Sequence, residues 1–218
     1  MKGLAPQTTK IFDRVSQLKC IEQFVLVGGT ALSIQIDTRQ SEDLDFMRWK
    51  SGRNDRLEVD WPRIKKELSI IGNIESVDVL GLDMVEFVVD GVKLSFYAAP
   101  RKQPMSLKKV LCKNNLYLAD IKSIGGMKME TMLRRSKFRD YYDVYSILKA
   151  GVDIKDLIDI ALEHSGHVLK KRNLLAILTE GERFRKDEAF AHLNPIYDVT
   201  SADIENYIKE LLLEDLSK

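Results

Sequence analysis

The feature that most constrains this fold is an apolar run that ends at two glycines. Phe24–Val27 is a run of four consecutive apolar residues, and Gly28-Gly29 follows it directly. A short apolar run closed by glycine is typical of a buried strand that ends in a tight turn. Helical spacing resumes over Thr30–Ile36, and a second apolar setting then holds the triplet Asp43–Asp45. The stretch therefore predicts a strand, a glycine turn, a short helix and a second strand.

Residue periodicity elsewhere predicts a chain that is mixed at first and helical afterwards. Asp90-Gly91 separates two β-rich segments and predicts a hairpin with a type I′ turn. Gly125-Gly126 interrupts one helical pattern, and no strand is expected after about residue 116. The expected helices are 8–22, 30–36, 61–71, 118–135, 138–149, 154–164, 168–180 and 202–216, and the expected strands are 24–27, 43–49, 76–80, 84–89 and 92–98. This order predicts an α+β fold with two domains, 1–115 and 116–218.

Composition excludes some classes of protein and leaves others open. The 34 basic and 33 acidic side chains nearly cancel, so a nucleic-acid partner would need a local basic patch. Cys20 and Cys112 form no CxxC pattern, which indicates free thiols in a reducing compartment. No signal-peptide pattern and no run of about 20 apolar residues is present. We expect a soluble cytoplasmic protein with no membrane partner.

The aspartates of the triplet indicate a metal site. Asp43 and Asp45 lie two apart on a predicted strand, so both side chains should project from one face. Two carboxylates directed at one point repel each other unless a cation lies between them, and Mg²⁺ is the usual solution where phosphates bind. Two solvated acids at a strand end are the alternative, since this pattern is common by itself. Gly28-Gly29 favours the metal site, because backbone amides at a helix N-terminus bind phosphate oxygens.

Residues 28–46 resemble the nucleotidyltransferase core of the AbiEii/AbiGii toxin family. The family pattern is GG-T-x-L, then an arginine, a serine and D-L-D-F. The matching residues are Gly28, Gly29, Thr30, Leu32, Arg39, Ser41, Asp43, Leu44, Asp45 and Phe46. The resemblance implies a polymerase-β-like core, with a mixed or antiparallel sheet and flanking helices, followed by a C-terminal helical bundle. It also implies Mg²⁺-dependent transfer of a nucleotide from a nucleoside triphosphate, with Asp43 and Asp45 as metal ligands.

A second motif of the family, K…RDxxDhxxL, is matched further along the chain. Lys128, Asp140 and Asp143 stand at its charged positions, and Leu148 stands at its last position. The resemblance implies that Lys128 binds phosphate as a compact cation, and that Asp140 and Asp143 belong to the nucleotide site. Asp140 is expected to position the lysine, contact the nucleotide or activate the acceptor hydroxyl. A salt-bridged surface helix is the alternative interpretation of these charges.

One departure from the superfamily pattern concerns catalysis. Polymerase-β-like enzymes commonly carry a third carboxylate on a later strand, and Ser95 stands where that acid is expected. Glu86 on the partner strand is one substitute, and Asp140 or a substrate group is another. If none of these acts, the chain binds nucleotides without transferring them.

Three functions follow as hypotheses. The first is a nucleotidyltransferase toxin that uses Gly28, Gly29, Thr30, Arg39 and Ser41 to hold the triphosphate. The resemblance suggests a tRNA 3′ end as its acceptor and a cognate antitoxin as its partner. The second is a nucleotidyltransferase with a small-molecule acceptor, as in antibiotic modification, and the third is a non-catalytic nucleotide-binding protein. His164 and His167 lack nearby acidic or thiol ligands in the sequence, so no metal site is expected there.

Overall fold

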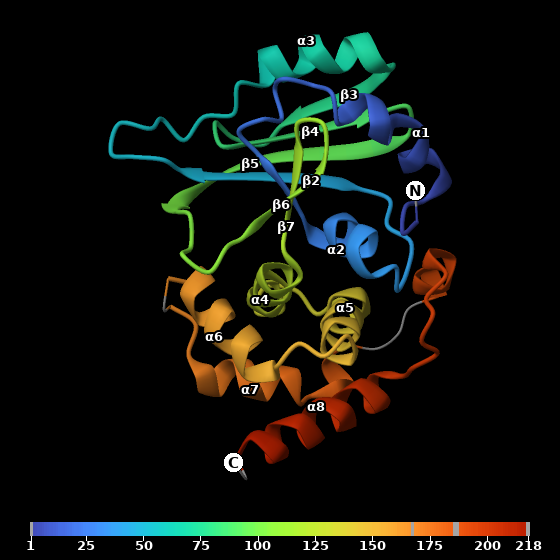
Figure 1. Ribbon diagram of the computed structural model, residues 1–218, viewed down its shortest axis with the longest axis vertical. Helices are drawn as coiled ribbons and strands as arrows, with labels where there is room; N and C mark the ends of the chain where they lie inside the picture. Colours follow the sequence, from blue (N-terminus) through green and yellow to red (C-terminus); the bar gives the residue numbers. More distant parts are fainter. Residues whose placement is uncertain (1, 167, 185–187, 217–218) are drawn as a thin grey trace. The chain divides into compact units, whose positions relative to one another are not determined.

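The computed structural model describes residues 2–166, 168–184 and 188–216 (Figure 1). The chain divides into two compact units, Met1–Asp120 and Ile121–Lys218. The first unit contains a mixed seven-stranded sheet with helices on its faces, and the second contains only helices. The α+β class expected from the sequence is confirmed.

The sheet of the first unit has the strand order β3-β4-β5-β2-β1-β7-β6. Its strands are β1 (Val25–Val27), β2 (Leu44–Lys50), β3 (Ile74–Val79), β4 (Met84–Val89), β5 (Val92–Lys102), β6 (Lys109–Lys113) and β7 (Leu116–Ala119). Two neighbouring pairs are parallel, β1 with β7 and β2 with β5, and the other pairs are antiparallel. The sheet is therefore mixed, as the family resemblance implied.

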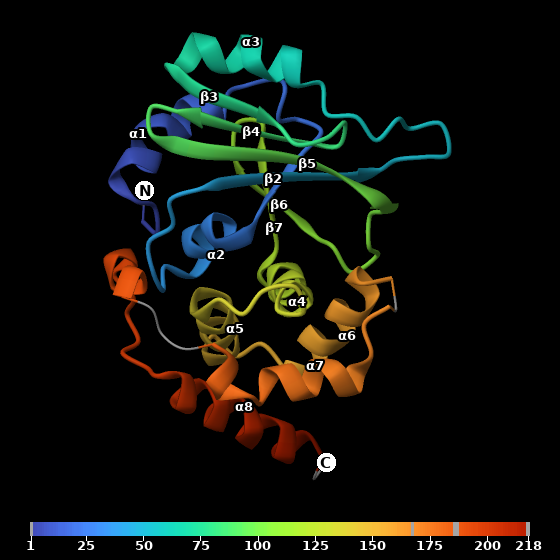
Figure 2. The same ribbon diagram turned by 180° about the vertical axis from the view of Figure 1, so that it is seen from behind.

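The helices of the first unit lie on both faces of this sheet (Figures 1 and 2). They are α1 (Pro6–Val15), α2 (Gly28–Ile36) and α3 (Trp61–Ile71). Helices α1 and α3 pack together on one face, whereas α2 lies on the other, against β1 and β2. Proline in the first turn starts both α1 and α3, since a missing N–H costs nothing at that position.

Alternating side chains separate a packed face of the sheet from a polar face. Phe96 of β5 stacks on Phe46 of β2, with 5.0 Å between ring centroids, and meets Phe24 edge-on at 5.3 Å. All three rings are at most 2% exposed. Because side chains alternate along a strand, Asp45 and Ser95, next to Phe46 and Phe96, project from the opposite face. The packing of the aromatic core thus determines where the polar groups emerge.

The hairpin between β4 and β5 has the predicted turn. Asp90 and Gly91 both have positive φ, 47° and 75°, as a type I′ turn requires. The hairpin fixes the register of the two strands, which pairs Glu86 with Ser95. The turn chemistry therefore sets which polar side chains share a row across the sheet.

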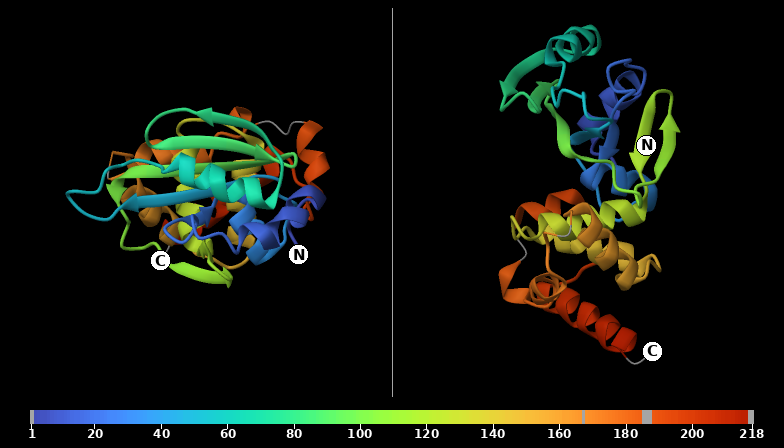
Figure 3. Two further views of the ribbon diagram at one scale, coloured as in Figure 1. Left: turned by 90° about the horizontal axis from the view of Figure 1, so that it is seen from above. Right: turned by 90° about the vertical axis from the view of Figure 1, so that its left-hand side faces the viewer.

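Some of the elements predicted from the sequence differ in the structure. β6 was not among the expected strands and no strand was expected after about residue 116, yet β6 and β7 form a hairpin at one end of the sheet (Figure 3). The expected helix 118–135 instead runs from Ile121 to Thr131. The two compact units divide after Asp120. The first helix, expected over 8–22, ends at Val15, and the Asn115 side chain donates to the carbonyls of Gln17 and Leu18 in the segment that follows.

The second unit is a group of helices around an aromatic core. Its helices are α4 (Ile121–Thr131), α5 (Phe138–Lys149), α6 (Ile154–His164), α7 (Lys171–Leu178) and α8 (Ser201–Leu216), with short 3-10 helices at Gly181–Arg183 and Glu188–Leu193. Tyr141 and Tyr142 of α5 are fully buried and contact Phe184 and Phe190. These tyrosines therefore serve packing. Within the described residues, the chain has no helix of the length and apolarity that crossing a membrane requires.

Candidate active site

The glycine turn after β1 lies directly against an aspartate. Gly28 opens α2 in the left-handed region, at φ +71°. A Cβ added to it would lie 2.9 Å from Oδ2 of Asp45. The register explains this contact, because Val27 pairs with Asp45 across the antiparallel β1–β2 ladder. A carboxylate therefore lies at the N-terminus of a helix, on a backbone that only glycine adopts without strain.

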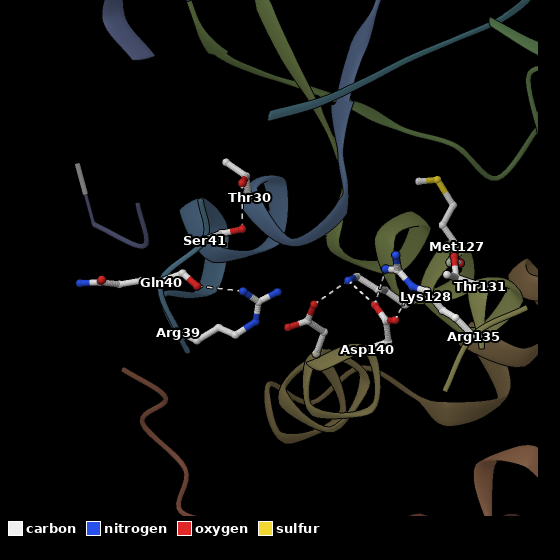
Figure 4. A network of polar contacts seen from close by, with 10 residues as sticks. Thr30, Arg39, Gln40, Ser41, Met127, Lys128, Thr131, Arg135 and Asp140 are labelled. Carbon is white, nitrogen blue, oxygen red and sulfur yellow. Dashed lines mark hydrogen bonds and ion pairs between the residues drawn. The ribbon is translucent and has the colours of Figure 1, made fainter. Parts of the chain in front are cut away.

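The second glycine lies against an arginine and a serine. A Cβ on Gly29 would collide with Nη2 of Arg39 and lie 3.1 Å from Oγ of Ser41. The Thr30 hydroxyl donates to the carbonyl of Asp43, and Oγ of Ser41 lies 2.9 Å from the same hydroxyl (Figure 4). Arg39 is only 4% exposed and donates to the carbonyl of Gln40. Because Gly29 has no side chain, it leaves room for the buried Arg39 guanidinium beside the start of α2.

The two aspartates occupy slightly different positions from those expected. Asp45 lies on β2, whereas Asp43 directly precedes the strand, which begins at Leu44. Both side chains are partly exposed. Asp43 lines a hollow of about 230 Å³ together with Glu42 and Lys93. The Thr30 hydroxyl thus binds the main-chain carbonyl of Asp43, a residue that lies outside the paired strand.

Ser95, which stands where a third carboxylate was expected, belongs to a row of polar side chains. Asp45 pairs with Ser95 across the parallel β2–β5 ladder, and Ser95 pairs with Glu86 across β5–β4. Partners in register project from one face, so these side chains form a row across three strands. Oγ of Ser95 donates to Oε1 of Glu86 at 3.3 Å, and Nζ of Lys93 lies 3.6 Å from the same oxygen. A carboxylate is therefore present in the row, one strand beyond the expected position.

The second unit holds a separate cluster of charges around Lys128. Its ammonium lies 2.8 Å from Oδ1 of Asp140 and 2.8 Å from Oδ2 of Asp143. The Arg135 guanidinium also binds Asp140 (Figure 4): its Nε donates to Oδ2 at 2.8 Å and its Nη2 donates to Oδ1 at 3.0 Å. Both aspartates are fully buried and Lys128 is 6% exposed. Two cations and two carboxylates therefore neutralise one another, with the aspartates and Lys128 buried and Arg135 closing the cluster from the exposed side.

This arrangement controls the ionisation of Asp140. Burial alone raises the pKa of its carboxyl, but the Lys128 ammonium and the Arg135 guanidinium outweigh that effect and lower the pKa to about 2. Asp140 is consequently a weak base near neutral pH. The salt-bridged surface helix is the wrong interpretation of this motif, because its acids lie inside the unit.

The structure brings together the predicted site residues of each unit. The first unit gathers Gly28, Gly29, Thr30, Arg39, Ser41 and Asp45 around the start of α2, and Asp43 joins them through its main-chain carbonyl. The second gathers Lys128, Asp140 and Asp143 between α4 and α5. Arg135 also belongs to this cluster and was not among the predicted site residues. Its signal was its place five residues before Asp140, just outside the N-terminus of α5.

The donor atoms at the start of α2 suit a hard divalent cation. Asp43 and Asp45 offer carboxylate oxygens, the ligand type that Mg²⁺ prefers. Over the described residues, no three or more side chains of His, Cys, Asp or Glu gather in one group. Mg²⁺ commonly binds through one or two carboxylates and completes its shell with phosphate oxygens and water. The residues present therefore fit the ion when a nucleotide supplies the remaining ligands. Of the two histidines that the sequence analysis set aside, His164 is buried and His167 lies outside the described residues.

Comparisons with known proteins place the chain in a family. Residues 10–217 match the family model described as nucleotidyl transferase AbiEii toxin, type IV TA system. An uncharacterized protein of Aquifex aeolicus is 26% identical over 220 residues, covering 97% of this chain and 99% of that protein.

Solved structures share the fold at low sequence identity. MenT4, a nucleotidyltransferase toxin from Mycobacterium tuberculosis, superposes with a TM-score of 0.59 at 15% identity, covering 94% of this chain and 80% of its own. JHP933 from Helicobacter pylori superposes with a TM-score of 0.52 at 19% identity, covering 98% and 97%. The motifs around α2 and Lys128, together with a family match across nearly the whole length, show that this chain is a nucleotidyltransferase that belongs to the AbiEii toxin family.

Proposed function

We propose that this enzyme transfers a nucleoside monophosphate from a nucleoside triphosphate to an acceptor hydroxyl, and that a tRNA 3′ end is the acceptor. The observation that carries the proposal is the convergence of Asp45 on Gly28, with Arg39 and Ser41 against Gly29. These contacts combine a metal-binding carboxylate, a helix N-terminus and a guanidinium, the three groups that a triphosphate with its metal needs.

Each residue has a role in this proposal. Asp43 and Asp45 would hold Mg²⁺, which when bound neutralises charge on the triphosphate oxygens. The amides at Gly28 and Gly29, with the hydroxyls of Thr30 and Ser41 and the Arg39 guanidinium, bind those oxygens and fix their orientation. Placement and charge neutralisation supply most of the catalysis in phosphoryl chemistry.

The Lys128 cluster is proposed to serve the same reaction, as the order of the two motifs in the family suggests. Lys128 contributes its positive charge to the phosphates, and Asp143 holds its ammonium from a second side. For Asp140 we favour positioning of Lys128 over the role of general base. An efficient base has a pKa near the working pH, whereas the Asp140 pKa is lowered to about 2.

A transfer assay tests the proposal. Purified protein is incubated with each α-labelled nucleoside triphosphate and Mg²⁺, together with total tRNA, an aminoglycoside or no acceptor. We expect label on tRNA, reduced about 100-fold or more by Asp45→Asn or Lys128→Ala. The matched controls Asp159→Asn and Lys122→Ala replace exposed residues of the same types and should retain full activity.

The other hypotheses predict different outcomes of this assay. Label on the aminoglycoside alone would establish the small-molecule enzyme, which the acidic Glu42 and Asp43 beside the hollow of about 230 Å³ would suit. Nucleotide binding without transfer to any acceptor would identify a binding protein, as the serine at position 95 allows. We further propose a cytoplasmic location and a cognate antitoxin, which a small DNA-binding regulator encoded by the neighbouring gene would support.

A further inference from the structure

A second hollow of the first unit has a lining unlike that of the hollow beside Asp43. It measures about 410 Å³ and contains no carboxylate in its lining. The lining residues are Gln23, Trp49, Lys50, Ser51, Lys102, Gln103 and Lys109. We call Trp49, Lys50, Lys102 and Lys109 the Trp49 patch. An aromatic ring among lysines is the composition of surfaces that bind single-stranded nucleic acid.

Trp49, the aromatic residue of the patch, lies on the same sheet face as Asp45. Asp45 and Trp49 are four residues apart on β2, so their side chains project from one face, about 13 Å apart along the strand. The β2–β5 register stays unbroken from Asp45 to Trp49 and shifts only between Trp49 and Lys50. A bound chain could therefore extend along β2 from the patch towards Asp45.

The charges of the patch favour an anionic partner. Lys50 and Lys102 are register partners on β2 and β5, and like charges placed directly opposite each other destabilise a sheet. The segment 101–109 adds Arg101 and Lys108 and has no acid. Bound phosphates would relieve this repulsion, whereas a cationic small molecule would be repelled.

We propose that the Trp49 patch binds the backbone of a single-stranded RNA acceptor. Lysines contact successive phosphates while the Trp49 indole stacks on a base, and the acceptor end reaches the Asp45 side of the same face. The inference rests on the proposed transfer to RNA and names the surface that holds that acceptor.

An RNA-binding measurement tests this surface. The probe is a fluorescein-labelled RNA single strand of about 12 nucleotides, and its binding is monitored by fluorescence anisotropy in the absence of nucleoside triphosphate. The variant Lys50→Gln/Lys102→Gln/Lys109→Gln should bind at least about 10-fold more weakly. Its slope of log affinity against log salt should be shallower by about 2, since each lost phosphate contact removes about 0.7. The control Lys10→Gln/Lys65→Gln/Lys66→Gln removes the same charge from exposed positions on α1 and α3 and should bind as the unsubstituted protein does.

Tryptophan fluorescence provides a second readout. The chain has only two tryptophans, so Trp61→Phe leaves Trp49 as the single reporter. Its emission should be quenched by the RNA. In the full-length protein, Trp49→Phe should retain most of the affinity and Trp49→Leu should lose about 5-fold or more, the equivalent of one stacked base.

Several results would overturn the inference: no RNA binding, equal losses in the patch and control variants, or binding only to vesicles of anionic lipid. Asp45→Asn should lose transfer but bind RNA as tightly as the unsubstituted protein. The two proposals can also fail separately: if the unsubstituted protein binds RNA through the patch but transfers no label to any acceptor, the proposed function fails alone. If it transfers label to RNA while the patch variant keeps the same KM for RNA, the inference fails alone.

Discussion

At the scale of single residues, the ionisation of Asp140 makes the stability of the protein depend on pH. Its pKa is about 2 in the folded protein against a usual value of 3.8, so folding favours the charged form. The stabilisation, about 2 kcal/mol, is fully present above about pH 4 and is lost as the pH falls towards 2. Asp140→Asn should lower the free energy of unfolding at pH 7 by about 3 kcal/mol. Urea unfolding should show the gap to the unsubstituted protein narrowing below about pH 4.

Asp159→Asn is the matched control for this prediction. Asp159 is exposed on α6, so its substitution should leave the unfolding free energy unchanged within about 0.5 kcal/mol at every pH. An Asp140→Asn protein whose deficit stays constant from pH 7 to below pH 4 would contradict the assigned pKa. The cause of the instability would then be packing rather than charge.

At the scale of helices, Gly125-Gly126 of α4 is a packing site. The pair does not break α4, which runs unbroken from Ile121 to Thr131. A Cβ on Gly126 would collide with Cγ2 of Ile160 on α6, and one on Gly125 would lie 2.7 Å from Cδ2 of Leu157. Helix propensity favours alanine at Gly126 by about 1 kcal/mol. We nevertheless expect Gly126→Ala to destabilise the protein by about 1–3 kcal/mol, because overpacking outweighs that gain.

A double-mutant cycle separates these two effects. Ile160→Ala removes the colliding methyl, so Gly126→Ala should cost at least about 1 kcal/mol less in that background. Thermal unfolding of the four proteins measures this coupling. Additive effects of the two substitutions would show that α4 and α6 do not meet at these residues.

The sequence predicted well those helices and strands whose bounds are determined by their own residues, through periodicity and turn-forming residues. Helices α3, α5 and α6 and strand β4 have the bounds expected from periodicity and turn chemistry. The short β7 was missed, because its four residues pair on one side with β6 and on the other with β1, about ninety positions earlier in the chain, and neither pairing shows in the periodicity of so short a segment. The charged residues of each motif were found because they match a family pattern. Arg135 was not, since its bond to Asp140 depends on the turn between α4 and α5.

At the scale of the whole molecule, the place where the chain divides depends on β7. This strand contributes the buried Leu116, Leu118 and Ala119 and pairs with β1 through Leu26 and Leu118. The Ala119 carbonyl also accepts a bond of 3.0 Å from Nε2 of Gln35 on α2. The strand that leads into the glycine turn is therefore supported on one side by residues next to the unit boundary.

This dependence gives a prediction about two truncated chains. Residues 1–120 contain all seven strands and should unfold cooperatively in urea, with a far-ultraviolet spectrum of mixed helix and sheet. Residues 1–115 end where the sequence alone placed the boundary, and they lack β7, so β1 loses a neighbour and β6 loses its paired strand. Burial of three apolar side chains is worth several kcal/mol, a large part of the stability of a small domain. The shorter chain should therefore be at most partly folded at 25 °C. Equal urea midpoints for the two fragments would show that β7 belongs to neither unit's stable core.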